Sequence, residues 1–344
     1  MDRNFYSASL SESGYMNNEN EKAKQQLISI LKARQAVLFA GAGCSKVAGY
    51  PLWDELLIGM IKDLTPSLSK PQNIDNMAFA DIIKNQMIKE AREKEYYKYL
   101  EKCFKPRNDR NHTNFHCALV QLGFSGIITT NYDILLETAV GESFSTDSFY
   151  LRCDPIDLCL PKPYRVFDFL RNLSPNTNHS HVLHIHGYYE NTENIILTER
   201  DYLKKYGQFD DTFEQSSNRI LDTIHRKVIW SILATHPIVF VGFSMDDEFF
   251  MRMLNIVQQD FELGYDPVYF SIMGYGNNED LERTLMILKK NGVVPIFYHA
   301  PKPSPLFNAD HSGLERLVFD IADKVGVQIG CPSLQTITQR MLER

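Results

Sequence analysis

Six short runs of consecutive apolar residues form the strongest pattern along the chain. Helical stretches, with apolar residues three or four positions apart, lie between most of these runs. Apolar residues that are continuous rather than alternating indicate strands covered on both faces, which is typical of a parallel sheet. The runs cover residues 36–40, 126–130, 182–186, 238–241, 268–272 and 293–298. They predict an α/β fold with a doubly wound, Rossmann-like parallel sheet of about six strands.

The segments around these runs suggest how the chain is divided. Residues 1–20 are polar and rich in Asn and Ser, which predicts a flexible N-terminal arm. The sheet-forming domain is expected over residues 21–310, with a helical insertion or cap at about 54–122. A second insertion at about 141–180 is interrupted by prolines and is expected to be irregular. Residues 311–344 are expected to form C-terminal helices.

Composition narrows the class of protein. With 344 residues, of which 44% are hydrophobic, the chain can bury a substantial core. A formal charge of −7 argues against a broadly basic surface, so strong direct binding of nucleic acid is not expected. No apolar run approaches the roughly 20 residues of a bilayer span, and no signal-peptide core is present, so a cytoplasmic protein without a membrane partner is predicted. The six cysteines form no C-x-x-C pair, which predicts free thiols.

A glycine-rich segment, Gly-Ala-Gly-Cys-Ser at residues 41–45, follows the first apolar run. Such a turn between a buried strand and a helix lets the backbone approach a pyrophosphate, whose charge the helix N-terminus favours. The segment departs from the G-x-G-x-x-G fingerprint because Lys46 stands where the third glycine should be. A tight strand-to-helix turn without a ligand is the alternative interpretation.

The second apolar run leads into Thr-Asn-Tyr-Asp at residues 130–133. Polar side chains here lie just past the carboxyl edge of the predicted sheet, where open α/β sheets bind their ligands. Asn131 is suited to orient water or a ribose hydroxyl. Asp133 either accepts a hydrogen bond from a sugar or fixes the loop and caps the next helix.

A third polar segment, Gly-Phe-Ser at residues 242–244, follows the fourth run. Gly242 permits close approach of a ligand, and Ser244 can donate a hydrogen bond to a phosphate or a ribose. The carboxylates of Asp246 and Asp247 come directly afterwards and are interpreted as caps of the following helix.

Four histidines, His179, His181, His184 and His186, lie close together in the sequence. A strand period of two places only some of them on one face, and no Cys or acidic residue stands at helical spacing, so no metal site is predicted. His184 is expected to pack within the strand, and the first two are expected in a loop. His186, at the strand end before Gly187, can present its imidazole to the ligand edge as a general base.

In this order, the motifs resemble the sirtuin family, in particular its bacterial Sir2-like branch associated with antiphage defence. The matching stretches are 41–45, 130–133, 186–187 and 242–244, which together extend over about 200 residues. The resemblance implies that the protein binds NAD as a substrate at the carboxyl edge of the sheet.

The resemblance also implies a role for each matching residue. The pyrophosphate would be bound by Gly41, Ala42, Gly43 and Ser45, and the adenosine side would be lined by Gly242 and Ser244. Asn131 and Asp133 would contact the nicotinamide ribose and the reactive water, with His186 as the catalytic base.

Two departures from the family bear on the reaction. Protein-deacylating sirtuins hold a zinc module with two C-x-x-C pairs, whereas this chain has no cysteine between Cys159 and Cys331, so no zinc is expected. The arginine that usually follows the Pro-x-Phe of the family is replaced, because the segment here reads Pro-Leu-Trp-Asp at residues 51–54. Both departures favour plain hydrolysis of NAD to nicotinamide and ADP-ribose over deacylation of a peptide.

Unregulated hydrolysis of NAD would kill the host cell, so the resemblance also implies control by assembly. We expect a homo-oligomer that works with a partner subunit, best matched by a HerA-like hexameric motor ATPase. Three other functions stay open from the sequence. They are an NAD-dependent protein deacylase, a non-catalytic nucleotide-sensing module, and a nuclease that would use the acidic cluster at residues 246–248.

Overall fold

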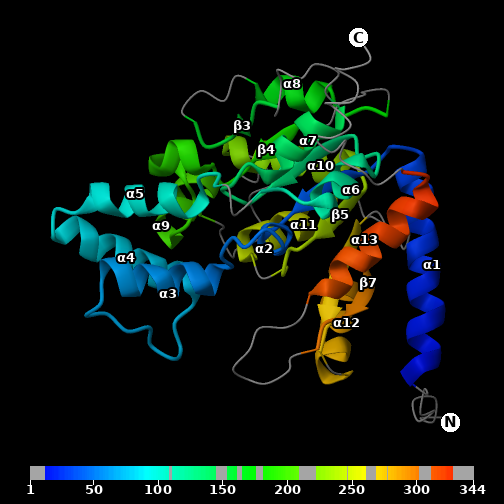
Figure 1. The fold of residues 1–344 in the computed structure, drawn as a ribbon, viewed down its shortest axis with the longest axis horizontal. Helices are drawn as coiled ribbons and strands as arrows, with labels where there is room; N and C mark the ends of the chain where they lie inside the picture. The colour runs from blue at the N-terminus through cyan, green and yellow to red at the C-terminus, as the bar shows by residue number, and fades with distance from the viewer. Residues whose placement is uncertain are drawn as a thin grey trace, which may run out of the picture.

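A parallel sheet forms the centre of the molecule. The structure is a computed structural model, and it describes residues 12–107, 111–144, 153–160, 165–175, 181–208, 222–245, 247–260, 269–276, 278–301 and 311–327. Its strands are β1 (Val37–Ala40), β2 (Gly126–Thr129), β3 (Ile156–Asp157), β4 (Val182–His184), β5 (Ile238–Val241), β6 (Tyr269–Tyr275) and β7 (Val293–His299). All pairings are parallel, and the order across the sheet is β3-β4-β2-β1-β5-β6-β7 (Figure 1). The predicted α/β fold is confirmed.

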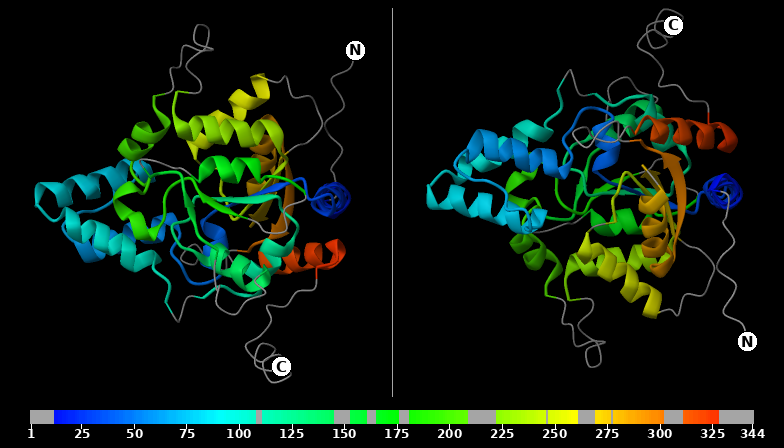
Figure 2. Two further views of the ribbon diagram at one scale, coloured as in Figure 1. Left: turned by 90° about the horizontal axis from the view of Figure 1, so that it is seen from above. Right: turned by 90° about the horizontal axis from the view of Figure 1, so that it is seen from below.

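Helices cover both faces of this sheet. They are α1 (Glu12–Lys32), α2 (Ala42–Lys46), α3 (Trp53–Leu64), α4 (Asn76–Lys89), α5 (Glu93–Phe104), α6 (Asn114–Gln121), α7 (Leu135–Phe144), α8 (Val166–Arg171), α9 (Glu199–Tyr206), α10 (Ile224–Thr235), α11 (Glu248–Asp260), α12 (Asn278–Lys290) and α13 (Ser312–Val325), with a 3₁₀ segment η1 (Tyr189–Asn194). One core cluster joins the sheet to α1, α6, α7 and α13, and the other joins it to α8 through α12 (Figure 2).

Strand β1 explains why the apolar runs are continuous. Leu38 and Ala40 belong to the core on one face of the sheet, whereas Val37 and Phe39 belong to the core on the other. Every position of the strand is therefore buried, and an alternating pattern cannot arise.

Strand β1 lies at the centre of the sheet. The strands β2, β4 and β3 lie on one side of it, and β5, β6 and β7 lie on the other. Ala40 at the end of β1 pairs with Thr129 of β2 and with Val241 of β5, so three loops leave the sheet side by side at their carboxyl ends. A crevice forms where the strand order reverses in such a fold, and ligands bind there.

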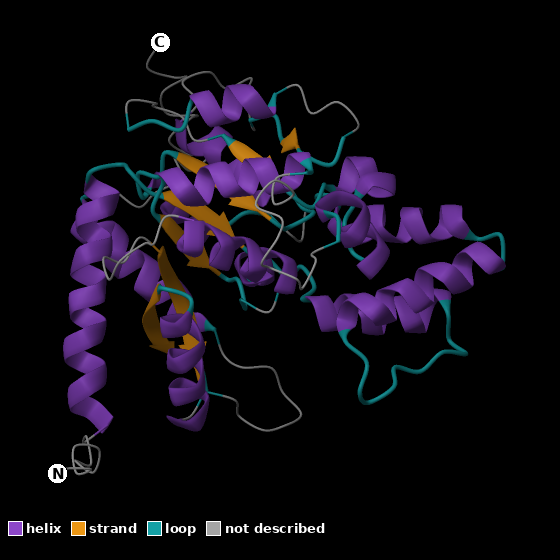
Figure 3. Cartoon of the chain, turned by 180° about the vertical axis from the view of Figure 1, so that it is seen from behind, coloured by secondary structure: helices purple, strands orange, loops and turns teal. Residues whose placement is uncertain are grey.

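Helices α3, α4 and α5 form a cap that extends away from the sheet (Figures 1 and 3). The cap has its own apolar core, which includes Met60, Phe79 and Leu100 and continues into Ile134 and Tyr189 beside the sheet. The predicted insertion at 54–122 is too long as a description of this cap. Its last helix, α6, packs on the sheet with α7 and α13.

Other boundaries also differ from the expectation. The segment at 141–180, expected to be irregular, contains the short edge strand β3 and helix α8. Helix α1 begins at Glu12, within the predicted arm, and the rest of that arm lies outside the described residues. Of the predicted C-terminal helices, α13 is described, and residues 328–344 lie outside the described part.

The opposite edge strand, β7, is bound by α1. The side-chain amide of Asn20 donates to the carbonyl oxygen of Phe297 at 3.0 Å, and the backbone N–H of Phe297 donates back to Asn20 Oδ1 at 2.8 Å. This pair of bonds satisfies edge backbone groups that would otherwise be available to another strand. In the described part of the chain, no helix has the length and apolarity that crossing a membrane requires.

The described cysteines divide into two groups, and Cys331 lies outside the described residues. Cys44, Cys103, Cys153 and Cys159 are free, whereas Cys117 is disulfide-bonded. The prediction of free thiols is therefore wrong for Cys117, because the absence of a C-x-x-C pair does not exclude a disulfide between cysteines at other spacings.

Candidate active site

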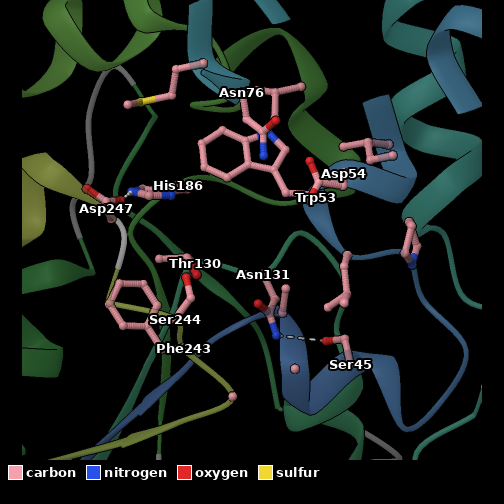
Figure 4. Close-up of a pocket in the computed structure, with 18 of the residues that line it drawn as sticks. Ser45, Trp53, Asp54, Asn76, Thr130, Asn131, His186, Phe243, Ser244 and Asp247 are labelled. Carbon is pink, nitrogen blue, oxygen red and sulfur yellow. Dashed lines mark hydrogen bonds and ion pairs between the residues drawn. The ribbon is translucent and has the colours of Figure 1, made fainter. Parts of the chain in front are cut away.

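A cavity of about 1030 Å³ lies at the carboxyl edge of the sheet, between the loops after β1, β2, β4 and β5 and the helices α3 and α9 (Figure 4). Its volume is at the upper end of the range for small-molecule sites, about 300–1,000 Å³. Of the site residues predicted from sequence, the cavity is lined by Ala42, Gly43, Ser45, Asn131, Asp133, His186, Gly242 and Ser244. Gly41 lies behind this surface rather than on it.

The glycines of the two loops allow the loops to touch. The N–H of Gly43 donates to the carbonyl oxygen of Gly242 at 2.8 Å. A Cβ atom on Gly41 would lie 2.5 Å from that same oxygen, and a Cβ atom on Gly43 would lie 2.7 Å from Gly242 Cα. Gly242 also has a φ of 63°. The structure thus gives these glycines a packing role, and their contact with a pyrophosphate stays a prediction.

Asn131 joins the loop after β2 to the loop after β1. Its side-chain nitrogen donates to the carbonyl oxygen of Gly41 at 2.9 Å and to Ser45 Oγ at 2.8 Å. Within the described residues its buried Oδ1 has no hydrogen-bond partner. Figure 4 shows the nitrogen turned toward Ser45 and the oxygen turned away from it. A buried acceptor without a partner is costly, so this oxygen is suited to a donor supplied by water or a ligand hydroxyl.

Asp133 fixes the same loop. Its Oδ2 accepts a hydrogen bond of 2.6 Å from the hydroxyl of Ser45, and its Oδ1 accepts one of 3.1 Å from the N–H of Leu135. Burial raises the pKa of Asp133 above its ordinary value. Both oxygens are engaged within the protein, which supports the loop-fixing interpretation. Contacts of Asp133 and Ser45 with a sugar or phosphate stay predictions.

His184 binds the backbone of Asn131. It is buried in β4, as the sequence predicts, and its Nδ1 donates to the carbonyl oxygen of Asn131 at 2.8 Å. Its Nε2 lies 2.5 Å from Oε1 of Glu137, which is also buried. Although burial lowers the pKa of His184, the carboxylate of Glu137 raises it above its ordinary value. The pair therefore holds the loop that carries Asn131.

His186 lies at the end of this strand and lines the cavity. Its Nε2 lies 3.0 Å from the hydroxyl of Tyr206 and 3.9 Å from Oδ2 of Asp247. The rings of Tyr202 and Tyr206 meet its imidazole edge-on. Burial, aided by the nearby His225, lowers the pKa of His186 to about 3. The imidazole is therefore neutral near pH 7, the state in which a ring nitrogen can accept a proton.

The sequence analysis gives no role in the site to Tyr202 and Tyr206 of α9. They lie four residues apart, so they share one face of the helix. A signal was present, because the capping-box pattern from Thr198 to Asp201 marks the helix start, and Tyr202 and Tyr206 follow it. Nothing local to His186 indicated that this helix would pack against it.

Of the other residues that the sequence singled out, His181 precedes β4, while His179 and Asp246 lie outside the described residues.

Among the described side chains, His112, Cys117 and Glu142 bring potential metal-ligand atoms within 4.8 Å of one another. These three lie away from the cavity, and the sulfur of Cys117 is committed to a disulfide.

Comparison with known proteins places this site in a family. The sequence profile described as a SIR2-like domain matches residues 125–296, which is half of the chain. The chain belongs to the SIR2-like domain family. The matched part of this SIR2-like domain runs from the residue before β2 into β7, and it contains Asn131, His186 and Gly242.

Two relatives of this SIR2-like domain have descriptive names. One is "Defense-associated sirtuin 2" of Bacillus subtilis, 25% identical over 231 residues, which are 65% of this chain and 19% of that protein. Another is "NAD(+) hydrolase ThsA" of Enterococcus faecium, 24% identical over 229 residues, which are 65% of this chain and 40% of that protein. The match thus spans less than half the length of either relative.

Proposed function

We propose that this protein is an NAD⁺ hydrolase that cleaves the nicotinamide glycosidic bond and acts in antiphage defence by depleting NAD. The observation that carries the proposal is the shared cavity, which is lined by both Asn131 and His186 although they lie 55 residues apart in the sequence. The names of the two relatives, one a defence-associated sirtuin and the other an NAD(+) hydrolase, support the same reaction and the same biological role.

The proposed reaction uses the neutral imidazole of His186 and the buried oxygen of Asn131. The bond between ribose C1′ and the nicotinamide nitrogen breaks, its electron pair leaves with nicotinamide, and positive charge develops on the ribose. Water attacks C1′, and His186 accepts the proton that this water loses. Oδ1 of Asn131 accepts a hydrogen bond from the water or from a ribose hydroxyl. The products are nicotinamide, ADP-ribose and one proton, which His186 returns to solvent.

The cavity has room for the rest of the substrate. Beyond Gly242 and Ser244 it continues past Ile272, Met273 and Gly274 at the end of β6. This extension supports placing the adenosine half of NAD there and the nicotinamide half beside His186. A dinucleotide that spans the loops after β1 and β5 would lie across the reversal in strand order.

The regulation we propose follows from the resemblance to defence sirtuins. The protein would act in the cytoplasm as a homo-oligomer, in complex with a HerA-like ATPase that controls its turnover of NAD. Light scattering of the purified chain tests the first part, and co-purification with a co-encoded ATPase tests the second. A monomer that hydrolyses NAD at the same rate with and without the ATPase would contradict this regulation.

Turnover of NAD by the purified chain tests the activity. Nicotinamide and ADP-ribose would be followed by chromatography, with and without the ATPase, for the native chain and for Asn131→Ala and His186→Ala. Each variant should lose about 100-fold or more in kcat. Asn291→Ala is a matched control, because Asn291 is 7% exposed, like Asn131, but lies away from the cavity. His236→Ala is the corresponding control for histidine.

The alternatives give different results in the same assay. NAD that stays intact under every condition, while an acetylated peptide is deacylated, would identify a protein deacylase. NAD that binds but is never consumed would identify a nucleotide-sensing module. Either outcome contradicts hydrolysis.

A further inference from the structure

Asp247 is a buried carboxylate that faces the candidate active site. Its side chain is 7% exposed and lines the cavity. Oδ1 accepts a hydrogen bond of 2.9 Å from the N–H of Phe250 in the first turn of α11, which is the capping role expected from sequence. Capping does not account for Oδ2. That oxygen accepts a hydrogen bond of 2.9 Å from the hydroxyl of Tyr202 and lies 3.9 Å from Nε2 of His186.

The orientation of the His186 ring places one of its nitrogens toward Oδ2 of Asp247. Nε2 of the imidazole faces Tyr206 and Asp247, and within the described residues Nδ1 has no hydrogen-bond partner. Figure 4 shows one ring nitrogen turned toward Asp247 and the other turned away from it. Nδ1 is therefore the nitrogen available to accept a proton in the cavity. A histidine used in this way is held in the correct tautomer when its other nitrogen donates its N–H to fixed oxygens.

We propose that Asp247 is a positioning residue for the hydrolysis, which holds the proton of His186 on Nε2 and stabilises the imidazolium that forms when Nδ1 takes a proton from the attacking water. The inference rests on the proposed function. In the step, an O–H bond of water breaks, the O–C1′ bond forms and the C1′–N bond breaks. The water proton moves to Nδ1 and then to solvent, and Asp247 stays ionised throughout.

The surroundings of Asp247 make its charge dependent on pH. Burial raises the pKa of Asp247 above the ordinary aspartate value, although the hydrogen bonds from Phe250 and Tyr202 lower it in part. The carboxylate of Glu248, at the start of α11, adds a smaller upward effect. The other titratable groups that interact with the carboxylate are His186 after β4, the phenols of Tyr202 and Tyr206 on α9, and the phenol of Tyr132 after β2. A protonated Asp247 cannot stabilise an imidazolium. Activity should therefore fall as the pH is lowered through the pKa of Asp247.

The variant Asp247→Asn separates charge from structure. Its side-chain oxygen can still cap α11, and its volume is nearly unchanged, but the negative charge is removed. We expect kcat for NAD to fall about 100-fold with KM changed less than about 3-fold. In the native protein, kcat/KM should fall as the pH is lowered through the pKa of Asp247. In Asp247→Asn this fall should be absent, and kcat/KM should fall only at the lower pH at which His186 is protonated.

A matched control comes from Asp157. This aspartate is also buried and accepts a hydrogen bond of 2.7 Å from the N–H of Cys159, but it does not line the cavity. Asp157→Asn should keep the native kcat and acid limb. If both variants lose the same activity, or if Asp247→Asn keeps the native kcat and pH profile, the proposed role of Asp247 is wrong.

A second readout needs no turnover. The chemical shifts of the His186 ring, followed by NMR in the NAD-free protein, should change as Asp247 titrates in the native chain and should lose that change in Asp247→Asn. An absence of NAD hydrolysis together with this lost titration would reject the proposed function and keep the pairing of the two side chains. A His186 titration that is identical in both proteins would overturn the pairing itself.

Discussion

Replacing Gly242 with alanine should destabilise the protein by about 2–5 kcal/mol. Two physical effects combine in this value. The φ of 63° lies in the left-handed region, which costs a residue with a Cβ atom about 1–2 kcal/mol. The new Cβ would also lie 2.5 Å from the backbone nitrogen of Cys44 and 2.8 Å from the carbonyl carbon of Gly43. Backbone atoms cannot rotate away, so the overpacking adds about 1–3 kcal/mol.

Gly326→Ala isolates the first effect. Gly326 has a φ of 91° at the end of α13, and no atom lies within 4 Å of the position its Cβ would take. This variant should lose only about 1–2 kcal/mol. Equilibrium unfolding in urea, followed by circular dichroism, measures both free energies. Equal losses for the two variants would refute the reasoning, because they would show that the loops after β1 and β5 are not packed together at Gly242.

Two further predictions concern buried pairs around the site. Glu137→Gln removes the carboxylate beside His184 and should lower the free energy of unfolding by about 3 kcal/mol near pH 6. Because the folded pKa of His184 is raised, the native protein should lose this contribution as the pH rises through that pKa, whereas Glu137→Gln should not. Parallel pH dependences in urea unfolding would exclude the pair. Lys84→Met breaks an ion pair of 2.9 Å with Asp201 that links α4 of the cap to α9. Amide hydrogen exchange in both helices should accelerate about 10-fold, and unchanged exchange would contradict the link.

The sequence predicts most of the sheet, because burial on both faces leaves a direct trace. The run at residues 238–241 coincides with β5, and the other runs match their strands to within three residues at either end. Strand β3 left no such trace, since two residues, Ile156–Asp157, are too few to establish a period. Helix α6 was assigned to the cap because an apolar helical pattern does not reveal which core it joins.

The candidate site, too, is predictable only where its residues directly follow the strands. Asn131, His186 and Gly242 follow strands directly, and parallel strands bring their carboxyl ends to one edge, so their meeting is predictable. The contacts of Tyr206 and Asp247 with His186 depend on how α9 and α11 pack, and no local pattern encodes that packing. The second oxygen of Asp247 could not be anticipated, because its sequence position already explained the residue as a cap.

The most direct test of the account is the fate of oxygen from labelled water. The purified chain, with its ATPase partner if the chain alone is inactive, would convert NAD in H₂¹⁸O without any acyl substrate. We expect nicotinamide and ADP-ribose in equal amounts, one ¹⁸O atom in each ADP-ribose, and neither product with His186→Ala. ADP-ribose that forms without label, or at the native rate in His186→Ala, would contradict water attack at C1′ assisted by this histidine.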